Sequence, residues 1–264
     1  MEPETDYAGR EDVGRRQAQE DYYAFACPDG EGTSLLLAVL GDGMGGAEGG
    51  ALASRSAVEA FIHAFRQAGA GQPVQHRLTS ALEAANQALA RIVDERPDLD
   101  GMGTTLVGVC VTPAGLDWVS VGDSPLYLYR SRYLQRLNAD HSMQPLIDDE
   151  VRLGRLSPQD AARHPERNAL RSVVGGEPIE MVDASTRPVP LQADDVVVLA
   201  SDGLLTLREH DIQSVLQRYP GACAGDLAER LSAEVLACDE PGQDNLAVMT
   251  INGRIMTAQA GMGA

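Results

Sequence analysis

The chain has 264 residues, of which 44% are hydrophobic and 23% charged, a composition that excludes disorder throughout and is sufficient for one large α/β domain. Its 39 acidic and 21 basic side chains give a formal net charge of -18. Nucleic acid and anionic membrane surfaces would repel such a chain, so neither is expected as a partner, whereas cations are. Because most of the acidity serves solubility, function has to be inferred from particular aspartates.

The first part of the chain predicts strands followed by helices. After a polar N-terminal arm, residues 22–27 and 34–40 have the composition of strands, and the turn 28–32 separates them. A glycine-rich loop follows. Residues 48–68 then switch to helical periodicity, and residues 76–93 predict a second amphipathic helix, because apolar residues recur at steps of three and four.

The second part predicts further strands around a polar insertion. Short apolar runs with turns between them indicate an antiparallel meander over residues 104–111, 116–121, 126–130 and 133–137. Residues 139–180 are polar and contain several glycines and prolines, which is typical of a mobile helical or loop insertion. The remaining expected elements are a strand at 196–200, helices at 208–218 and 224–237, and a strand at 245–251.

This order of elements predicts a layered α+β architecture with sheet inside and helices outside. We expect one domain over residues 1–252 and a disordered tail over residues 253–264, which have no pattern. The four cysteines contain no C-x-x-C pair, which argues against a structural zinc site. No secretory signal is visible and no apolar run could span a bilayer, so a cytoplasmic location with reduced thiols is predicted.

Aspartates stand at the ends of the predicted strands. Asp42, Asp123 and Asp202 each follow an apolar strand, and Asp244 directly precedes one. One such residue alone is typical of a turn, but carboxylates fixed at strand ends can meet at one edge of a sheet, where a cation would neutralise them. Because these turns contain no histidine or cysteine, Mg²⁺ or Mn²⁺ is favoured over zinc. Two such ions, about 4 Å apart, can share a hydroxide for phosphoryl displacement.

The glycine-rich loop also permits a different interpretation. Gly41, Gly43 and Gly46 satisfy G-x-G-x-x-G between a strand and a helix, which is the fingerprint of dinucleotide binding. Against it, Asp42 would face the pyrophosphate, and a second helix follows where a parallel strand is required. We therefore disfavour a nucleotide-binding oxidoreductase.

Seven short motifs resemble, in order, those of the metal-dependent type 2C protein serine/threonine phosphatases. One tripeptide would be weak support, whereas seven in sequence are strong. The matching segments are R-x-x-x-E-D at Arg16 to Asp21, D-G-M-G-G at Asp42 to Gly46, G-T-T at Gly103 to Thr105, G-D-S at Gly122 to Ser124, D-H-S at Asp140 to Ser142, S-D-G at Ser201 to Gly203, and D-N at Asp244 and Asn245.

This resemblance implies a four-layer α-β-β-α sandwich, in which helix pairs flank two antiparallel sheets. It also implies that Asp42 bridges two Mn²⁺ or Mg²⁺ ions, with Asp202 and Asp244 on one ion and the Gly43 carbonyl on the other. Glu20 or Asp21 would assist through water. Asp123, together with Asp202, would hold a third, weaker ion.

Other matched residues receive roles from the same resemblance. Arg16 would grip the substrate phosphate, for which a planar guanidinium is suited. His141 and Ser142 are interpreted as ordering a loop, since no G-x-S-x-G elbow accompanies them. Residues 143–180 occupy the place of the family's flap, which contributes to the choice of substrate. Thr104 and Thr105 are expected to be structural residues at the start of a buried strand.

One position departs from the family pattern. Many members have histidine after D-G-M-G-G as a proposed general acid, and this chain has Ala47. We therefore predict either that a metal-bound water donates the proton or that alkyl phosphates turn over slowly, with aryl phosphates less affected. The predicted function is hydrolysis of phosphoserine and phosphothreonine on proteins, opposing a serine/threonine kinase. The alternative is a catalytically weak module that binds a phosphoprotein or a kinase.

Overall fold

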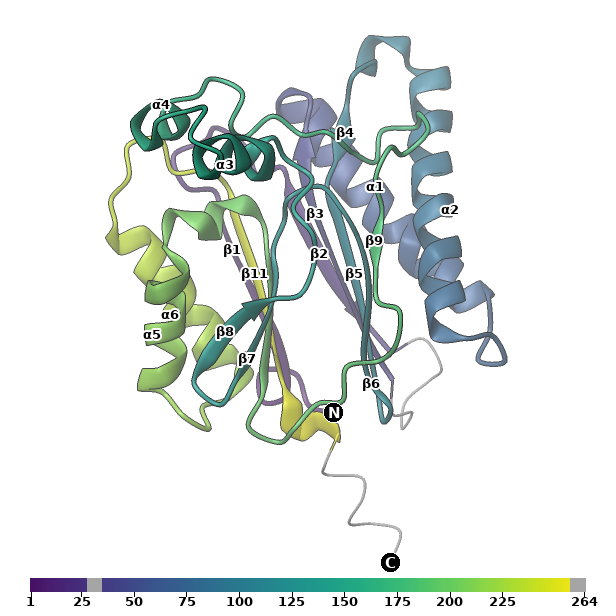
Figure 1. Ribbon diagram of the computed structural model, residues 1–264. Coiled ribbons are helices and arrows are strands. Elements are labelled where there is room, and N and C mark those ends of the chain that lie inside the picture. The colour runs from purple at the N-terminus through teal and green to yellow at the C-terminus, as the bar shows by residue number, and fades with distance from the viewer. Residues whose placement is uncertain (28–34, 257–264) are drawn as a thin grey trace, which may run out of the picture.

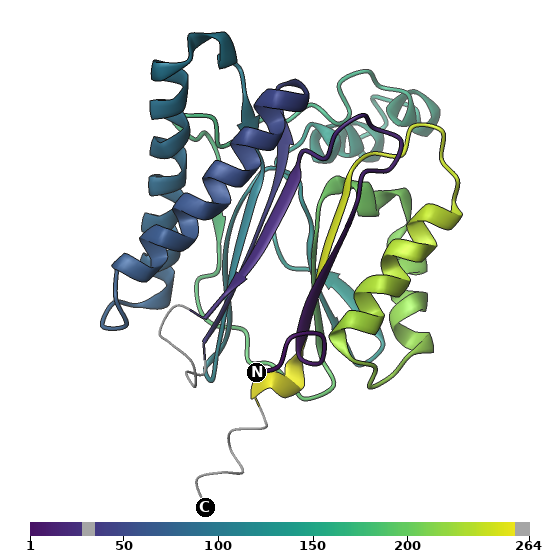
Figure 2. The ribbon, with the colours of Figure 1, turned by 180° about the vertical axis from the view of Figure 1, so that it is seen from behind.

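The computed structural model describes residues 1–27 and 35–256, and these form two antiparallel sheets packed face to face. Helices cover the outer face of each sheet, as Figure 1 and the reverse view in Figure 2 show. The predicted four-layer α-β-β-α sandwich is thus confirmed. Among the described residues, no helix has the length and the apolar character that crossing a membrane requires.

The first sheet gathers strands from both ends of the chain. Its strand order is β1 (Tyr7–Asp12), β11 (Leu246–Asn252), β10 (Val196–Ala200), β7 (Leu126–Arg130) and β8 (Tyr133–Arg136). Helices α5 (Glu209–Arg218) and α6 (Ala224–Ala237) pack on its outer face around Leu216, Leu231 and Val248.

The second sheet carries the glycine-rich loop. Its order is β2 (Asp21–Ala26), β3 (Leu36–Met44), β5 (Leu106–Thr112), β6 (Gly115–Val121) and β9 (Asp183–Ala184), with β4 (Gly103–Thr104) paired to the end of β3. Helices α1 (Gly46–Gln67) and α2 (Val74–Glu95) cover its outer face.

Strand β3 shows why its sequence is a continuous apolar run. Leu37 and Val39 pack under the helices, whereas Leu36 and Leu40 pack between the two sheets. Because both faces of the strand are buried, alternation between polar and apolar residues is absent. The end of this strand positions Asp42.

The predicted meander is wrong in one respect. Strands β5 and β6 form a hairpin in the second sheet, whereas β7 and β8 form a hairpin in the first. The chain passes from one sheet to the other between Val121 and Leu126, through Gly122, whose φ of 97° suits glycine. This crossing places Asp123 at the junction of the sheets.

The polar N-terminal arm contains a strand that we did not predict. Strand β1 pairs with β11, from Tyr7 opposite Ile251 to Asp12 opposite Leu246. It is an edge strand with the sequence YAGRED, and its side chains are mostly half-buried. Partial exposure allows a composition that does not indicate a strand.

The polar insertion contains two helices, α3 (Gln144–Arg152) and α4 (Pro158–Ala162), in agreement with the prediction. Both lie above the end of the sandwich where β3 ends (Figure 1). The predicted tail begins too early, because Gly253–Met256 form the short helix η3 and Ile255 is 2% exposed. The predicted turn at 28–32 and residues 257–264 lie outside the described residues.

Candidate active site

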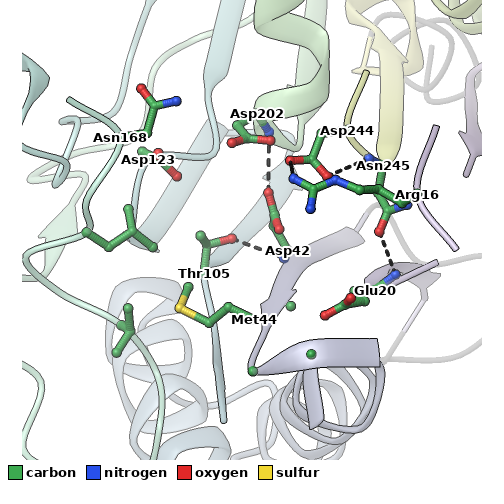
Figure 3. Close-up of a pocket in the computed structure, with 15 residues that line it drawn as sticks. Arg16, Glu20, Asp42, Met44, Thr105, Asp123, Asn168, Asp202, Asp244 and Asn245 are labelled. Carbon is green, nitrogen blue, oxygen red and sulfur yellow. Dashed lines mark hydrogen bonds and ion pairs between the residues drawn. The ribbon is translucent and has the colours of Figure 1, made fainter. Parts of the chain in front are cut away.

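The strand-end carboxylates of both sheets face a common cavity of about 500 Å³. Asp42 comes from the end of β3, Asp202 follows β10, Asp244 precedes β11, and Asp123 lies in the crossing between the sheets (Figure 3). The other side chains and glycines of the wall are Arg16, Glu20, Gly43, Met44, Gly45, Gly46, Thr105, Asn168, Leu170, Val173 and Asn245. The convergence expected from strand ends is therefore present.

Two threonines hold the main chain of Asp42. Its N–H donates to Thr105 Oγ1 at 3.1 Å, and its carbonyl accepts from the Thr105 N–H and from Thr104 Oγ1, each at 2.9 Å. Thr105 Oγ1 also lies 2.7 Å from Ser124 Oγ, next to Asp123. The two threonines are structural, as predicted, and they link the positions of Asp42 and Asp123.

Asp202 connects the two sheets at the cavity. The residue starts the short helix η2 (Asp202–Thr206), and its N–H donates to Asp42 Oδ2 over 3.5 Å (Figure 3). Because the donor and the acceptor belong to different sheets, the geometry of this pair depends on how the sheets pack.

The acidic pair Glu20 and Asp21 is divided between the cavity and the core. Glu20 lines the cavity, and its N–H donates to Asn245 Oδ1 at 2.8 Å. Asp21 is 4% exposed, stands opposite Asp42 in the ladder, and accepts a hydrogen bond from Ser201 Oγ at 2.6 Å. Of the two candidates, Glu20 is therefore the one that reaches the cavity.

Crowding of carboxylates raises their pKa values. Burial, followed by the charge of Asp244, raises the pKa of Asp202 from 3.8 to about 6. Burial, with Asp202 and Asp140 nearby, raises the pKa of Asp123 to about 7, and burial raises the pKa of Asp21 to about 7. Burial and the neighbouring aspartates raise the pKa of Asp42 well above 3.8. A bound cation would lower all four values.

Arg16 neutralises one member of this group. Its Nη2 lies 2.5 Å from Asp244 Oδ2, and 57% of the Arg16 side chain remains exposed. Figure 3 shows the guanidinium directly beside the Asp244 carboxylate, among the side chains that line the cavity. A cationic group thus already lies against the carboxylates.

The donors of this cavity suit a hard divalent cation. All of the acidic groups offer oxygen ligands, and the main chain of Gly43 lines the cavity beside them. Within residues 1–27 and 35–256, no three Asp, Glu, His or Cys side chains are close enough to hold an ion by themselves. Water and main-chain oxygens would have to complete a coordination shell, as is usual for Mg²⁺.

His141 and Ser142 behave as loop-ordering residues. The N–H of Gly122 donates to His141 Nδ1 at 3.2 Å, the His141 N–H donates to the Gly122 carbonyl at 3.1 Å, and Ser142 Oγ donates to Asp140 at 2.6 Å. His141 is buried, and burial lowers its pKa. The pair therefore supports the crossing that carries Asp123.

Several residues of the site were not identified from the sequence. Asn168, Leu170 and Val173 reach the cavity from the polar insertion, which has no periodic pattern to indicate it. Asn245 was part of a matched motif but received no role. Its amide donates to the carbonyls of Val13 and Ala18, both at 2.9 Å, and so fixes the segment that carries Arg16.

Comparisons with known proteins agree with this geometry. A family model described as protein phosphatase 2C matches residues 8–232. Serine/threonine phosphatase stp of Listeria monocytogenes serovar 1/2a is 30% identical over 220 residues, which are 81% of this chain and 83% of the relative.

Two crystal structures have the same fold. The Mycobacterium tuberculosis serine/threonine phosphatase PstP/Ppp matches with a TM-score of 0.76 and 30% identity, over 93% of this chain and 97% of that chain. The catalytic domain of PstP in complex with two manganese ions matches with a TM-score of 0.74 and 30% identity, over 93% of this chain and 96% of that chain. The chain therefore belongs to the protein phosphatase 2C family and is a protein phosphatase.

Proposed function

We propose that this protein hydrolyses phosphoserine and phosphothreonine esters on proteins with a pair of divalent cations, Mn²⁺ or Mg²⁺. The observation that carries the proposal is the meeting of Asp42, Asp202 and Asp244 from two sheets in one cavity. Relatives named serine/threonine phosphatases, one of them solved with two manganese ions, support it.

The proposed ligands divide between the two ions around Asp42. Asp42 would bridge them, Asp202 and Asp244 would hold one, and the Gly43 carbonyl would hold the other. Glu20 is favoured over Asp21 as the assisting group, because Glu20 lines the cavity and Asp21 is buried against Ser201. When bound, the ions supply an activated water and neutralise the charge that develops on the phosphoryl oxygens.

Asp123 is proposed to hold a third, weaker ion with Asp202. Both carboxylates line the same cavity, and the charge of Asp202 contributes to the raised pKa of Asp123. Asp123 lies in the segment that crosses between the sheets. Hydrogen bonds fix its two neighbours, since Gly122 bonds to His141 and Ser124 bonds to Thr105.

Arg16 is proposed to bind the substrate phosphate. In this structure the guanidinium pairs with Asp244 at the rim, and more than half of the side chain is exposed. A cation held by Asp244 would release the guanidinium, whose planar shape suits contact with two phosphate oxygens at once. The side chain that now shields the carboxylate would then orient the phosphoryl group.

We propose no side chain as the proton donor to the departing alkoxide. Position 47, in the first turn of α1, is Ala47, which carries no titratable group. The proton is therefore proposed to come from water, and release of serine or threonine is expected to be slower than release of an acidic phenol.

A serine/threonine kinase is proposed as the counterpart, because the substrate requires an enzyme that attaches the phosphate. The cytoplasmic location remains a prediction from the sequence. In the described part of the chain, Cys27, Cys223 and Cys238 form no disulfide, which is compatible with a reducing compartment.

Phosphate release from a phosphothreonine peptide, measured with and without Mn²⁺, tests the proposal. We expect turnover that requires Mn²⁺, stops with EDTA and falls at least about 100-fold in Asp202→Asn. Tight peptide binding without release above the Asp202→Asn rate would contradict the proposal and favour the weakly catalytic binding module instead.

A further inference from the structure

A second cavity, of about 560 Å³, adjoins the active-site cavity. Leu170 and Val173 line both cavities and form a shared wall. The second cavity lies between the end of α2, the turn at residues 100–102, and residues 170–180, which we call the strap. In Figure 1 and Figure 2 the strap runs from the insertion to the side of α2 before it enters β9.

The walls of this cavity are strongly acidic. Asp94, Asp100, Glu177 and Glu180 line it, and all four are exposed. None of the four forms an ion pair with another part of the chain that the structure describes. Arg171 also lines the cavity, but its single positive charge does not balance the four carboxylates. The formal charge of the lining is therefore negative. We call this feature the acidic groove.

Hydrogen bonds hold the strap against α2. Asn86 Oδ1 accepts from the N–H groups of Gly175 at 3.2 Å and Gly176 at 2.9 Å, and Asn86 Nδ2 donates to the Glu177 carbonyl at 2.8 Å. Gly176 has a φ of 97° and packs against the backbone of Ala90, where a Cβ would clash. The groove is therefore formed before any ligand arrives, which lowers the entropy lost on binding.

We propose that the acidic groove binds the substrate segment beside the phosphorylated residue and selects segments that carry lysine or arginine there. This inference rests on the proposed function, which places the phosphoryl group in the adjoining cavity. A polypeptide that leaves that cavity past Leu170 and Val173 enters the groove, where unpaired carboxylates face it. Exposed pairs of this kind each contribute a factor of about 1.4 to 5 in affinity.

The test compares phosphothreonine peptides that differ only in flanking charge. One peptide of each pair has two lysines on the N-terminal or the C-terminal side of phosphothreonine, and the other has two glutamines. On one side of phosphothreonine, we expect the wild type to prefer the lysine peptide over its glutamine counterpart by about 2- to 25-fold in kcat/KM at low salt. This preference should be lost in 0.5 M salt.

Two variants of equal charge locate the effect. The groove variant carries Asp94→Asn, Asp100→Asn, Glu177→Gln and Glu180→Gln. The control carries Glu59→Gln, Glu83→Gln, Asp194→Asn and Asp226→Asn, at exposed positions that line neither cavity. We expect the groove variant to lose the preference and the control to keep it, while p-nitrophenyl phosphate, which is too small to reach the groove, is hydrolysed equally by all three.

Other outcomes would overturn the proposal. These are a wild type without preference, a preference that survives in the groove variant, or an equal loss in the control. A groove variant with altered Mn²⁺ dependence but unchanged preference would assign the groove to a cation. Fluorescence anisotropy with the same peptides measures the binding preference without turnover. Failure of the proposed function would appear separately, as absence of p-nitrophenyl phosphate hydrolysis.

Discussion

At the scale of single residues, the electrostatics of the cavity are set by aspartates that the fold forces together. Asp202 is the clearest case, since burial and Asp244 raise its pKa to about 6 from 3.8. In the unfolded chain this carboxyl ionises near its ordinary value. Without a metal, the folded state therefore becomes less stable relative to the unfolded state as the pH rises from about 4 to about 6.

Asp202→Asn is expected to stabilise the metal-free protein, because it removes a charge that burial disfavours. The gain in Tm over the wild type should be small at pH 4.5 and reach about 5 °C at pH 7. Thermal unfolding in EDTA measures this difference in Tm. With excess Mn²⁺ the wild type should instead have the higher Tm. A pH-independent difference in EDTA would contradict this account of Asp202.

Ala47→His is expected to speed release of an alkoxide but not of a phenolate. If the first turn of α1 presents the imidazole to the leaving group, turnover of a phosphothreonine peptide should rise by about 10- to 100-fold. Hydrolysis of p-nitrophenyl phosphate should change less than about two-fold, because its leaving group needs no proton. Ala47→Asn is the non-titrating control. An equal rise on both substrates would show that proton donation is not the limiting factor.

At the scale of elements, the start of α1 is built from glycines that make room for Glu20. A Cβ on Gly50 would collide with the Glu20 carboxylate, and a Cβ on Gly43 would collide with the Gly50 carbonyl. The same helix has Gly49 one position earlier, where a Cβ would meet Met102 Cβ at 3.3 Å. Adjacent glycines therefore differ in whether they affect the cavity.

Gly50→Ala is expected to displace Glu20 and to raise the Mn²⁺ concentration needed for half-maximal activity by about 10-fold, as is usual for an outer-shell ligand. Gly49→Ala brings the same gain in helix propensity, but it should leave the Mn²⁺ concentration for half-maximal activity within about two-fold of the wild-type value. Titration of Mn²⁺ against initial rate checks both. Equal behaviour of the two variants would remove Glu20 from the proposed metal site.

The elements differ in how well their sequences predict them. Helices α1, α2, α5 and α6 were recognisable because their apolar positions repeat with a helical period, and the central strands because they are short, continuous apolar runs. Strand β1 was not, since an edge strand tolerates polar residues. The separation of β5 and β6 from β7 and β8 was also hidden, because hairpins of either sheet have the same local pattern.

The candidate site was predictable to a similar extent. Asp42, Asp123, Asp202 and Asp244 could be found because strand ends are visible in the sequence. The pairing of Arg16 with Asp244 could not, since it depends on the pairing of the unpredicted strand β1 with β11, in which Asp12 stands opposite Leu246. The acidic groove likewise depends on the contact between the strap and α2.

At the scale of the whole molecule, the active-site cavity lies where the two sheets meet. Asp42 belongs to the second sheet, whereas Asp202 and Asp244 adjoin strands of the first. Ions shared by these residues would link the two halves of the sandwich. Binding of Mn²⁺ at 100 times its Kd should therefore stabilise the fold by about 2.7 kcal/mol, which thermal unfolding would show as a higher Tm.

The position of the ions tests the central claim most directly. Anomalous diffraction from crystals grown with Mn²⁺ should show two strong peaks in the active-site cavity, both beside Asp42 and one of them also beside Asp202 and Asp244. A weaker third peak is expected beside Asp123. Absence of a peak beside Asp42, or manganese bound only in the acidic groove, would contradict the account.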